Sequence, residues 1–359
     1  MIGPLILVVR PRLGVGAFGV RIALIEILGL VILLTLLVVA GVLFVRWLQS
    51  RPRPRVVSVS KPVALKGVDN APVSAVEVLV LRDQARRKKL HLRITYPSII
   101  TSPTKLPIIV FSHGRGGSKD DYQLLVQYWC ARDYACIQLN HYDALPPKGK
   151  RLSRDLRDWA SRPKDVSLVL DSLSDIMQAI PELAERLDLE RIGVGGHSFG
   201  AHTAQLLGGL TARDHERGRV SYRDRRVSAV FLLSPQGRGR LHSPDSWSTI
   251  RLPMMTITGT RDDGRNGEDY TWRLDPFELS APGDKYLIVI RDADHGFGGI
   301  PRSSAQYPYA QDEEVAGIVQ EESLRFWNAY LKGDIDAREA LRSERSHGAI
   351  STRVELRTK

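Results

Sequence analysis

Cysteine is scarce in this sequence, with only Cys130 and Cys136 among 359 residues. So few cysteines exclude a disulfide-stapled scaffold, and we expect two separate buried thiols because Cys136 falls in an apolar segment. The chain also lacks the His-x-His and His-Glu-x-x-His spacings and any cysteine cluster, which are common sequence patterns of zinc sites. We therefore expect neither a metal site nor a cofactor.

Nucleic-acid-binding motifs are absent as well, although the chain is basic. Lysine and arginine exceed aspartate and glutamate by 51 to 40, a formal net charge of +11, and part of the excess lies in two short runs, 51–55 and 86–89. Neither run is interleaved with aromatic residues, so a solvated surface or contact with anionic lipid is favoured over DNA binding. The apolar content of 43% excludes disorder over most of the chain.

Charge is missing altogether from residues 27–45, which are mostly leucine, valine and isoleucine. A helix of this length is about 28 Å long, close to the thickness of the hydrocarbon core of a bilayer. We predict a transmembrane helix over residues 22–46 that forms a single-pass N-terminal membrane anchor. A cleaved signal peptide is the alternative, but the run is long for one and no small-residue cleavage site follows it.

Basic residues flank the predicted span on both sides, with more of them after it than before it. By the positive-inside rule this small excess favours a cytoplasmic position for the rest of the chain, but the side stays open. The predicted organisation is an N-terminal segment over 1–21, the membrane helix, a Pro/Arg-rich linker over 47–74, a large globular domain over 75–335 and a C-terminal tail over 336–359.

Two kinds of apolar pattern follow the predicted linker. Alternating apolar residues on either side of residues 82–86 predict a β-hairpin. From residue 106 onward, short apolar strands alternate with helical stretches, which predicts an α/β fold with a mostly parallel sheet covered on both faces. We expect strands near 108–111, 135–139, 192–194, 229–233, 254–258 and 286–290, one helix over about 163–180 and a last helix over 321–332 that ends at Gly333.

The segment 191–201, Arg-Ile-Gly-Val-Gly-Gly-His-Ser-Phe-Gly-Ala, has the G-x-S-x-G pattern of a nucleophile elbow around Ser198. A short strand precedes the serine and a helix follows it, and the small residues Gly196 and Gly200 allow the sharp turn to close. The backbone N–H of Phe199 would then point toward a developing oxyanion. Ser198 is therefore the candidate nucleophile.

An acid and a histidine follow this serine in the order that a catalytic triad on such a fold requires. The first lies after the strand at 254–258, in Gly-Thr-Arg-Asp-Asp-Gly, and the second after the strand at 286–290, in Asp-Ala-Asp-His-Gly-Phe. We expect His295 to act as the general base and Asp262 to orient it. Asp262 comes three residues after Gly259, which favours it over Asp263, a turn residue next to a glycine.

A second oxyanion donor is expected from the glycine-rich loop 112–118, Ser-His-Gly-Arg-Gly-Gly-Ser, which follows the strand at 108–111. Its glycines let the backbone approach the elbow, so the Arg115 N–H would join the Phe199 N–H in the oxyanion hole. We expect loops 142–161 and 264–278 to shape the pocket and His141 to line its mouth. His242 is expected on the surface or in a loop.

Together these segments resemble the α/β-hydrolase superfamily, in the branch of predicted dienelactone hydrolases akin to platelet-activating-factor acetylhydrolases and chlorophyllases. The resemblance covers about residues 75–335 and leaves the predicted membrane helix outside. It implies a mostly parallel eight-stranded sheet with helices on both faces and a serine carboxylic-ester hydrolase with Ser198, Asp262 and His295 as the triad. True dienelactone hydrolases use a cysteine, so the family name says little about the substrate. The segments that carry the resemblance are 111–118, 162–171, 196–203, 258–263 and 294–297.

Two other functions remain open. An acyltransferase would use the same triad and differ only in the group that receives the acyl chain. A catalytically silent, membrane-tethered binding module is the second alternative, although it has no need of all three triad residues. For the enzyme we expect a lipid-like or small-acyl ester as substrate and no nucleic-acid partner, and the oligomeric state is left open.

Overall fold

The computed structural model describes residues 29–43, 55–66, 72–99, 105–142, 159–301, 310–343 and 351–359. The chain divides into two compact units, Met1–Arg53 and Pro54–Lys359. In the first, residues 29–43 form a helix whose apolar side chains are exposed. Within the described part of the chain, no helix combines the length and the apolar character needed to cross a bilayer. Residues 22–28 and 44–46 of the predicted span lie outside the described residues.

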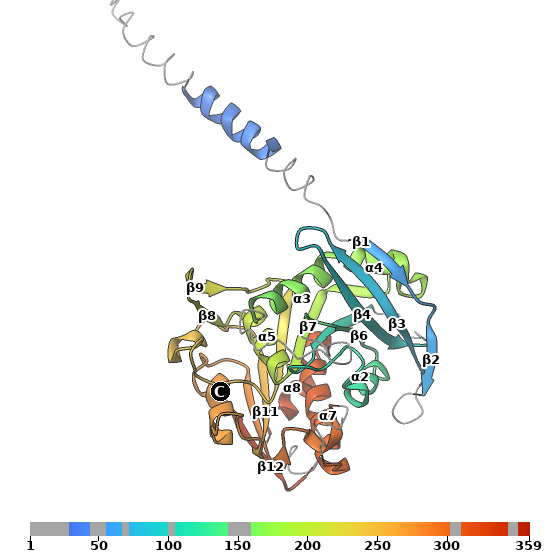
Figure 1. Ribbon diagram of the computed structural model, residues 1–359, viewed down its shortest axis with the longest axis vertical. Helices are drawn as coiled ribbons and strands as arrows, with labels where there is room; N and C mark the ends of the chain where they lie inside the picture. The colour runs from blue at the N-terminus through green and yellow to red at the C-terminus, as the bar shows by residue number, and fades with distance from the viewer. Residues whose placement is uncertain are drawn as a thin grey trace, which may run out of the picture. The chain divides into compact units, whose positions relative to one another are not determined.

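The second unit is built around one eleven-stranded sheet (Figure 1). The strands follow the order β1-β3-β4-β6-β5-β7-β10-β11-β12-β13, with β2 paired to β3. Six neighbouring strands run parallel to one another: β6, β5, β7, β10, β11 and β12. The predicted α/β class with a large, mostly parallel sheet is confirmed. The strands are β1 (Arg55–Val59), β2 (Val63–Lys66), β3 (Pro72–Asp83), β4 (Lys88–Pro97), β5 (Leu106–Ser112), β6 (Ala135–Leu139), β7 (Leu187–His197), β10 (Val227–Leu233), β11 (Met254–Arg261), β12 (Lys285–Asp294) and β13 (Val354–Thr358).

Two hydrophobic cores lie on opposite faces of this sheet. Along β5, Ile108 and Val110 pack into one core while Ile109 and Phe111 pack into the other, because successive side chains point to opposite faces. Figure 1 shows α3 and α5 on one side of the sheet and α2 and α7 on the other. The helices are α2 (Gln123–Cys130), α3 (Ser161–Asp171), α4 (Leu173–Ala179), α5 (Phe199–Gly208), α6 (Asp275–Glu278), α7 (Glu313–Trp327) and α8 (Ile335–Ala340).

Several elements differ from the prediction. The segment predicted as linker contains β1 and β2, and the predicted C-terminal tail contains α8 and β13, so the sheet has three strands more than the eight expected. A separate hairpin, β8 (Thr211–Asp214) and β9 (Gly218–Ser221), was not predicted. β1, β9 and β13 are largely exposed, so they lack the buried alternation that marks a strand in a sequence.

Helix ends differ too. The helix predicted after Pro163 is divided between α3 and α4 at Ser172, whose hydroxyl donates to the Leu168 carbonyl. The last long helix, α7, begins at Glu313, eight residues earlier than predicted, because Asp312 caps it by accepting from the Val315 N–H. A π-helical turn over Asn328–Lys332 then leads to Gly333, which ends it in the left-handed conformation at φ 71°.

Candidate active site

Ser198 occupies the sharp turn between β7 and α5. Its backbone is strained, with φ 53° and ψ −118°, a conformation that residues with a side chain rarely adopt. A Cβ atom on Gly196 would lie 2.3 Å from the Gly200 carbonyl, and one on Gly200 would lie 1.9 Å from the carbonyl oxygen of Ser112. Glycine is therefore required at both positions for α5 to start this close to β5 and β7.

Asp262 and His295 meet at the carboxyl ends of β11 and β12. His295 Nδ1 lies 2.7 Å from Asp262 Oδ1, and the Asp262 side chain is fully buried. The other carboxylate oxygen, Oδ2, accepts a hydrogen bond from Thr258 Oγ1 at 3.0 Å. Because a carboxylate only accepts hydrogen bonds, Nδ1 carries the proton and Nε2 is the basic nitrogen of His295.

Arg273 supplies the positive charge that balances the buried carboxylate. Its Nε lies 3.0 Å from Asp262 Oδ1, and its terminal nitrogens donate to the carbonyls of Ser234, Pro235 and Asp263. Burial lowers the pKa of Arg273, and the charge of Asp262 opposes that shift. The almost completely buried Arg273 side chain thus holds Asp262 in a fixed position.

Asp263 is placed differently. It is exposed, and its Oδ1 accepts a hydrogen bond from the Tyr270 N–H at 3.1 Å. This contact closes the loop that follows β11 instead of the local turn that the sequence suggested. Of the two neighbouring aspartates, Asp262 is therefore the one that the structure brings to His295.

Ser234, which follows β10, was not predicted from the sequence. Its hydroxyl lies 3.0 Å from Asp262 Oδ1 and 2.8 Å from His295 Nδ1, and its backbone has a positive φ of 54°. The Ser-Pro pair at the end of an apolar strand is the only local signal for this residue, and it indicates a turn rather than a contact. Ser234 thus helps to hold the acid and the histidine together.

The loop after β5 brings the predicted oxyanion donors to the elbow. Gly117 N–H donates to the Gly114 carbonyl at 3.2 Å, closing a turn in which Gly116 has φ 74°, as a type II turn requires at its third position. Arg115 and Phe199 both line the cavity that contains Ser198. Within the described chain, neither of their N–H groups donates to another protein atom.

A buried polar network supports this loop from behind. Arg162 is 1% exposed and donates to the carbonyls of His113 at 2.6 Å and Gly114 at 3.3 Å. Beside it, His141 joins Ser112 Oγ at 2.9 Å to the buried Asp165 at 3.0 Å. His141 thus lies inside this network and not among the residues that line the cavity, which corrects the prediction that it lines the pocket mouth.

The charge of Asp165 is matched by basic neighbours. Burial alone would raise the pKa of this carboxyl, but its hydrogen bond to His141 and the charges of His141 and Lys88 hold the pKa well below the usual range. Lys88 Nζ lies 2.6 Å from Asp165 Oδ2, and Arg86 also contacts the carboxylate at 2.6 Å. The network is therefore anchored to the β3–β4 hairpin.

A chain of hydrogen bonds links the glycine-rich loop 112–118, here called the oxyanion loop, to the loop after β12 that carries His295. Gly114 N–H donates to the Tyr122 hydroxyl, which lies 3.0 Å from His197 Nδ1, and His197 Nε2 lies 3.0 Å from the His295 carbonyl. That carbonyl only accepts, so His197 carries its proton on Nε2 and receives the Tyr122 proton at Nδ1. Burial, followed by the charge of His295, lowers the pKa of His197 well below its ordinary value, which keeps it neutral.

The cavity above Ser198 has a volume of about 740 Å³ and also contains His295. His202 and His242 form part of its wall, with their Nε2 atoms 2.7 Å apart and both side chains buried. His242 lies in a loop between β10 and β11, one of the two predicted locations, but it is buried and not on the surface. The predicted pocket loop 264–278 contributes to the wall, whereas residues 143–158 of the other predicted loop lie outside the described residues.

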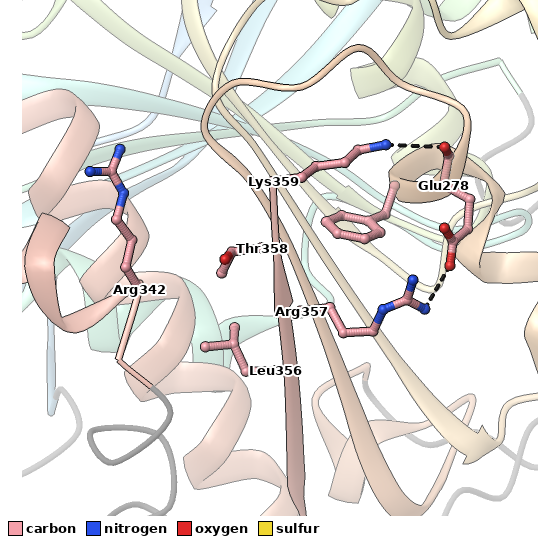
Figure 2. A pocket seen from close by; sticks show the side chains of 7 residues that line it. Glu278, Arg342, Leu356, Arg357, Thr358 and Lys359 are labelled. Atoms are coloured by element: carbon pink, nitrogen blue, oxygen red, sulfur yellow. Dashed lines mark hydrogen bonds and ion pairs between the residues drawn. The ribbon is translucent and has the colours of Figure 1, made fainter.

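A second pocket of about 470 Å³ lies beside the edge strand β13 (Figure 2). Arg357 and Lys359 flank the ring of Phe277, and both contact Glu278, at 2.6 Å through its carboxylate and at 3.0 Å through its carbonyl. Among the described residues that line this pocket there is no histidine or cysteine, and these two cations already have oxygen partners. Ser198 and His295 line the larger cavity instead.

Comparison with models of known protein families and with curated protein sequences finds no match to this chain. Among the described residues, no three histidine, cysteine or acidic side chains come together as a metal site would need. Cys130 and Cys136 are both buried thiols, and burial raises the pKa of Cys136 well above its usual value. Neither thiol has the exposed, electropositive surroundings of a reactive cysteine.

Proposed function

We propose that the protein is a serine carboxylic-ester hydrolase of the α/β-hydrolase superfamily. The observation that carries the proposal is the contact of His295 with the buried Asp262, since His295 lines the same cavity as a serine in strained backbone. A structural serine has no need of a strained turn, and a structural histidine has no need of a buried acid on Nδ1. The chain order serine, acid, histidine on successive strand ends of a parallel sheet supports the same assignment.

In the proposed mechanism, Ser198 Oγ attacks the carbonyl carbon of the ester while His295 Nε2 takes the serine proton. The negative charge that develops on the carbonyl oxygen is stabilised by the N–H groups of Arg115 and Phe199. His295 then gives its proton to the leaving alcohol, and an acyl-serine remains. Water, deprotonated by the same histidine, attacks the acyl group and releases the acid and free Ser198.

Asp262 holds His295 in the reactive tautomer and balances the imidazolium charge that forms during each half-reaction. Ser234 and Thr258 keep the carboxylate in place. The membrane anchor at residues 22–46 is part of the proposal, since the apolar run 27–45 that suggested it includes the described helix 29–43. Among the described residues that line the cavity, none favours acyl transfer or a silent binding role over hydrolysis.

A panel of neutral esters with increasing acyl length tests the proposal. We expect the full chain in detergent to hydrolyse at least one short-chain member, and Ser198→Ala to reduce turnover by about 10⁴-fold or more. Ser221→Ala, at an exposed serine of β9, is the matched control and should keep full activity. Equal turnover by the wild type and Ser198→Ala would reject the assignment of the nucleophile.

A further inference from the structure

The wall of the cavity above Ser198 is rich in arginine. Besides Arg273, which is committed to Asp262, the side chains of Arg115, Arg238, Arg240 and Arg265 contribute to it. Only two acidic residues, Asp263 and Glu268, are found among the described residues of the same wall. The cavity is therefore more basic than the chain as a whole, in which basic and acidic residues number 51 and 40.

The two acids of the wall are occupied by their own loop. Asp263 accepts from the Tyr270 N–H at 3.1 Å, and Glu268 accepts from both the backbone and the side-chain nitrogen of Asn266 at 3.0 Å. The described wall thus has five arginines and two acids, and this excess of positive charge favours the entry of an anion.

Arg238 and Arg240 keep donors available for such an anion. Arg240 is exposed and contacts no acidic side chain in the described part of the chain. Arg238 Nε lies 3.0 Å from Asp275 Oδ2, so this contact does not use the two terminal nitrogens of Arg238. The Arg238 side chain is 57% exposed. Arg238 and Arg240 belong to the segment after β10, and Arg265 belongs to the loop after β11.

Another part of the wall is apolar. Phe199, Leu241 and Trp272 contribute to it, and Trp272 is held by a hydrogen bond from Nε1 to the Arg238 carbonyl at 2.7 Å. The cavity thus combines room for an alkyl or acyl group with guanidinium groups that suit a planar or tetrahedral oxyanion. A neutral ester would use only the first of these features.

We propose that the substrate of this site is an ester that carries an anionic group, a phosphate or a carboxylate, which Arg238, Arg240 and Arg265 bind while Ser198 attacks the ester carbon. This inference rests on the proposed hydrolase function and names its substrate class. The arginines act in binding and in the orientation of the ester. Arg115 serves through its backbone N–H and adds its charge to the same wall.

Matched ester pairs test the proposal. For the carboxylate, the pair is p-nitrophenyl butyrate and mono-p-nitrophenyl succinate, and for the phosphate it is butyrylglycerol and butyrylglycerol 3-phosphate. We expect kcat/KM to be about tenfold higher or more for the anionic member of at least one pair, as one or two charge-assisted hydrogen bonds would give. The pair that shows the preference identifies which of the two anions the site takes.

Variants assign the preference to the arginines. Arg240→Gln and Arg265→Gln should each lower kcat/KM for the preferred anionic ester by about fivefold to tenfold, mainly through KM, and change the neutral ester less than twofold. Arg225→Gln removes the same charge at an exposed position before β10, at the opposite end of that strand, and should change neither. Added salt should reduce the preference.

The possible failures can be told apart. If the wild type hydrolyses neutral esters through Ser198 but prefers neither anionic ester, the anion site is refuted and the hydrolase remains. The same holds if Arg240→Gln and Arg265→Gln lower both members of a pair equally. If neither neutral nor anionic esters are turned over by a folded protein, the hydrolase function itself is refuted.

Discussion

Asp262 and Asp263 are neighbours in the chain, but their side chains have different surroundings. Asp262 is buried against His295, Ser234 and Thr258, whereas Asp263 is exposed and bonded to the Tyr270 N–H. Two consecutive aspartates therefore have different roles: Asp262 is the candidate catalytic acid, and Asp263 makes a loop contact. This difference makes the two positions a matched pair for testing the acid.

We expect Asp262→Asn to lower turnover by about 10⁴-fold, because an amide would favour the wrong tautomer of His295. Asp263→Asn should keep nearly full turnover and lose on the order of 1 kcal/mol of stability at most, since only one loop hydrogen bond weakens. The measurement is kcat for both variants beside their melting temperatures. A collapse of activity in Asp263→Asn alone would reverse the assignment.

Tyr122 is the second residue that can be tested against a matched control, the buried Tyr96. Its hydroxyl joins Gly114 to His197, so Tyr122→Phe breaks the link between the oxyanion loop and the loop of His295. We expect turnover to fall by about tenfold with little change in KM, because a displaced donor weakens oxyanion stabilisation more than substrate binding.

The control is Tyr96→Phe. The Tyr96 hydroxyl is also buried, but it has no hydrogen-bond partner within the described chain, so its removal should leave both activity and stability unchanged or slightly raise stability. Equal kinetics for Tyr122→Phe and the wild type would mean that the link does not position the site.

At the scale of elements, the strand ends follow from sequence because parallel strands buried on both faces are short, apolar and bounded by turns. β6 has the predicted bounds, and β5, β7, β10, β11 and β12 contain the predicted segments. The elbow and the two loops that carry Asp262 and His295 are also local patterns. The amino-acid sequence is therefore sufficient to locate them.

The supporting contacts could not be located in the same way. The bonds from Arg162 to His113, from Tyr122 to His197 and from Ser234 to Asp262 span 28 to 75 residues of the chain, so no local pattern marks these contacts. His242 was misjudged for the same reason, since its partner His202 lies 40 residues away on α5. The edge strands were missed because pairing at one exposed edge demands little of the sequence.

The His202–His242 contact between α5 and the segment after β10 predicts a pH dependence of stability. Burial lowers the pKa of His242 to about 4 and that of His202 well below its ordinary value. The unfolded chain takes up these protons near pH 6.5, so the stability that the neutral pair provides is present above pH 6.5 and is lost as pH falls toward 4.

We expect the free energy of unfolding to fall between pH 6.5 and 4, with His242 contributing up to about 1.4 kcal/mol per pH unit. His242→Gln should make this slope shallower, as measured by denaturant unfolding at pH 7, 6 and 5. His215→Gln, at an exposed position between β8 and β9, controls for the loss of a histidine as such. A wild-type slope in His242→Gln would contradict the account.

At the scale of the whole molecule, the unit Pro54–Lys359 contains every residue of the proposed site. Strand β1 pairs with β3, with Val56 opposite Leu81, so a truncated chain has to begin at Pro54 and not within the strand. We expect this chain to fold, to stay in solution and to hydrolyse a water-soluble ester at the rate of the full chain in detergent.

A chain that begins at Pro72 lacks β1 and β2 and is the comparison for this experiment. It should melt at a lower temperature because it uncovers one edge of β3. A folded but inactive Pro54–Lys359 chain, beside an active full chain, would show that the N-terminal unit is part of the site.

The central claim is that His295 and Asp262 make Ser198 a nucleophile. Its most direct measurement is the reaction of the folded protein with a fluorophosphonate, followed by the intact mass and peptide mapping. We expect one adduct per chain, on Ser198, formed far more slowly in Asp262→Asn and not at all in Ser198→Ala. A folded wild-type protein that forms no adduct, or forms it on another residue, would contradict it.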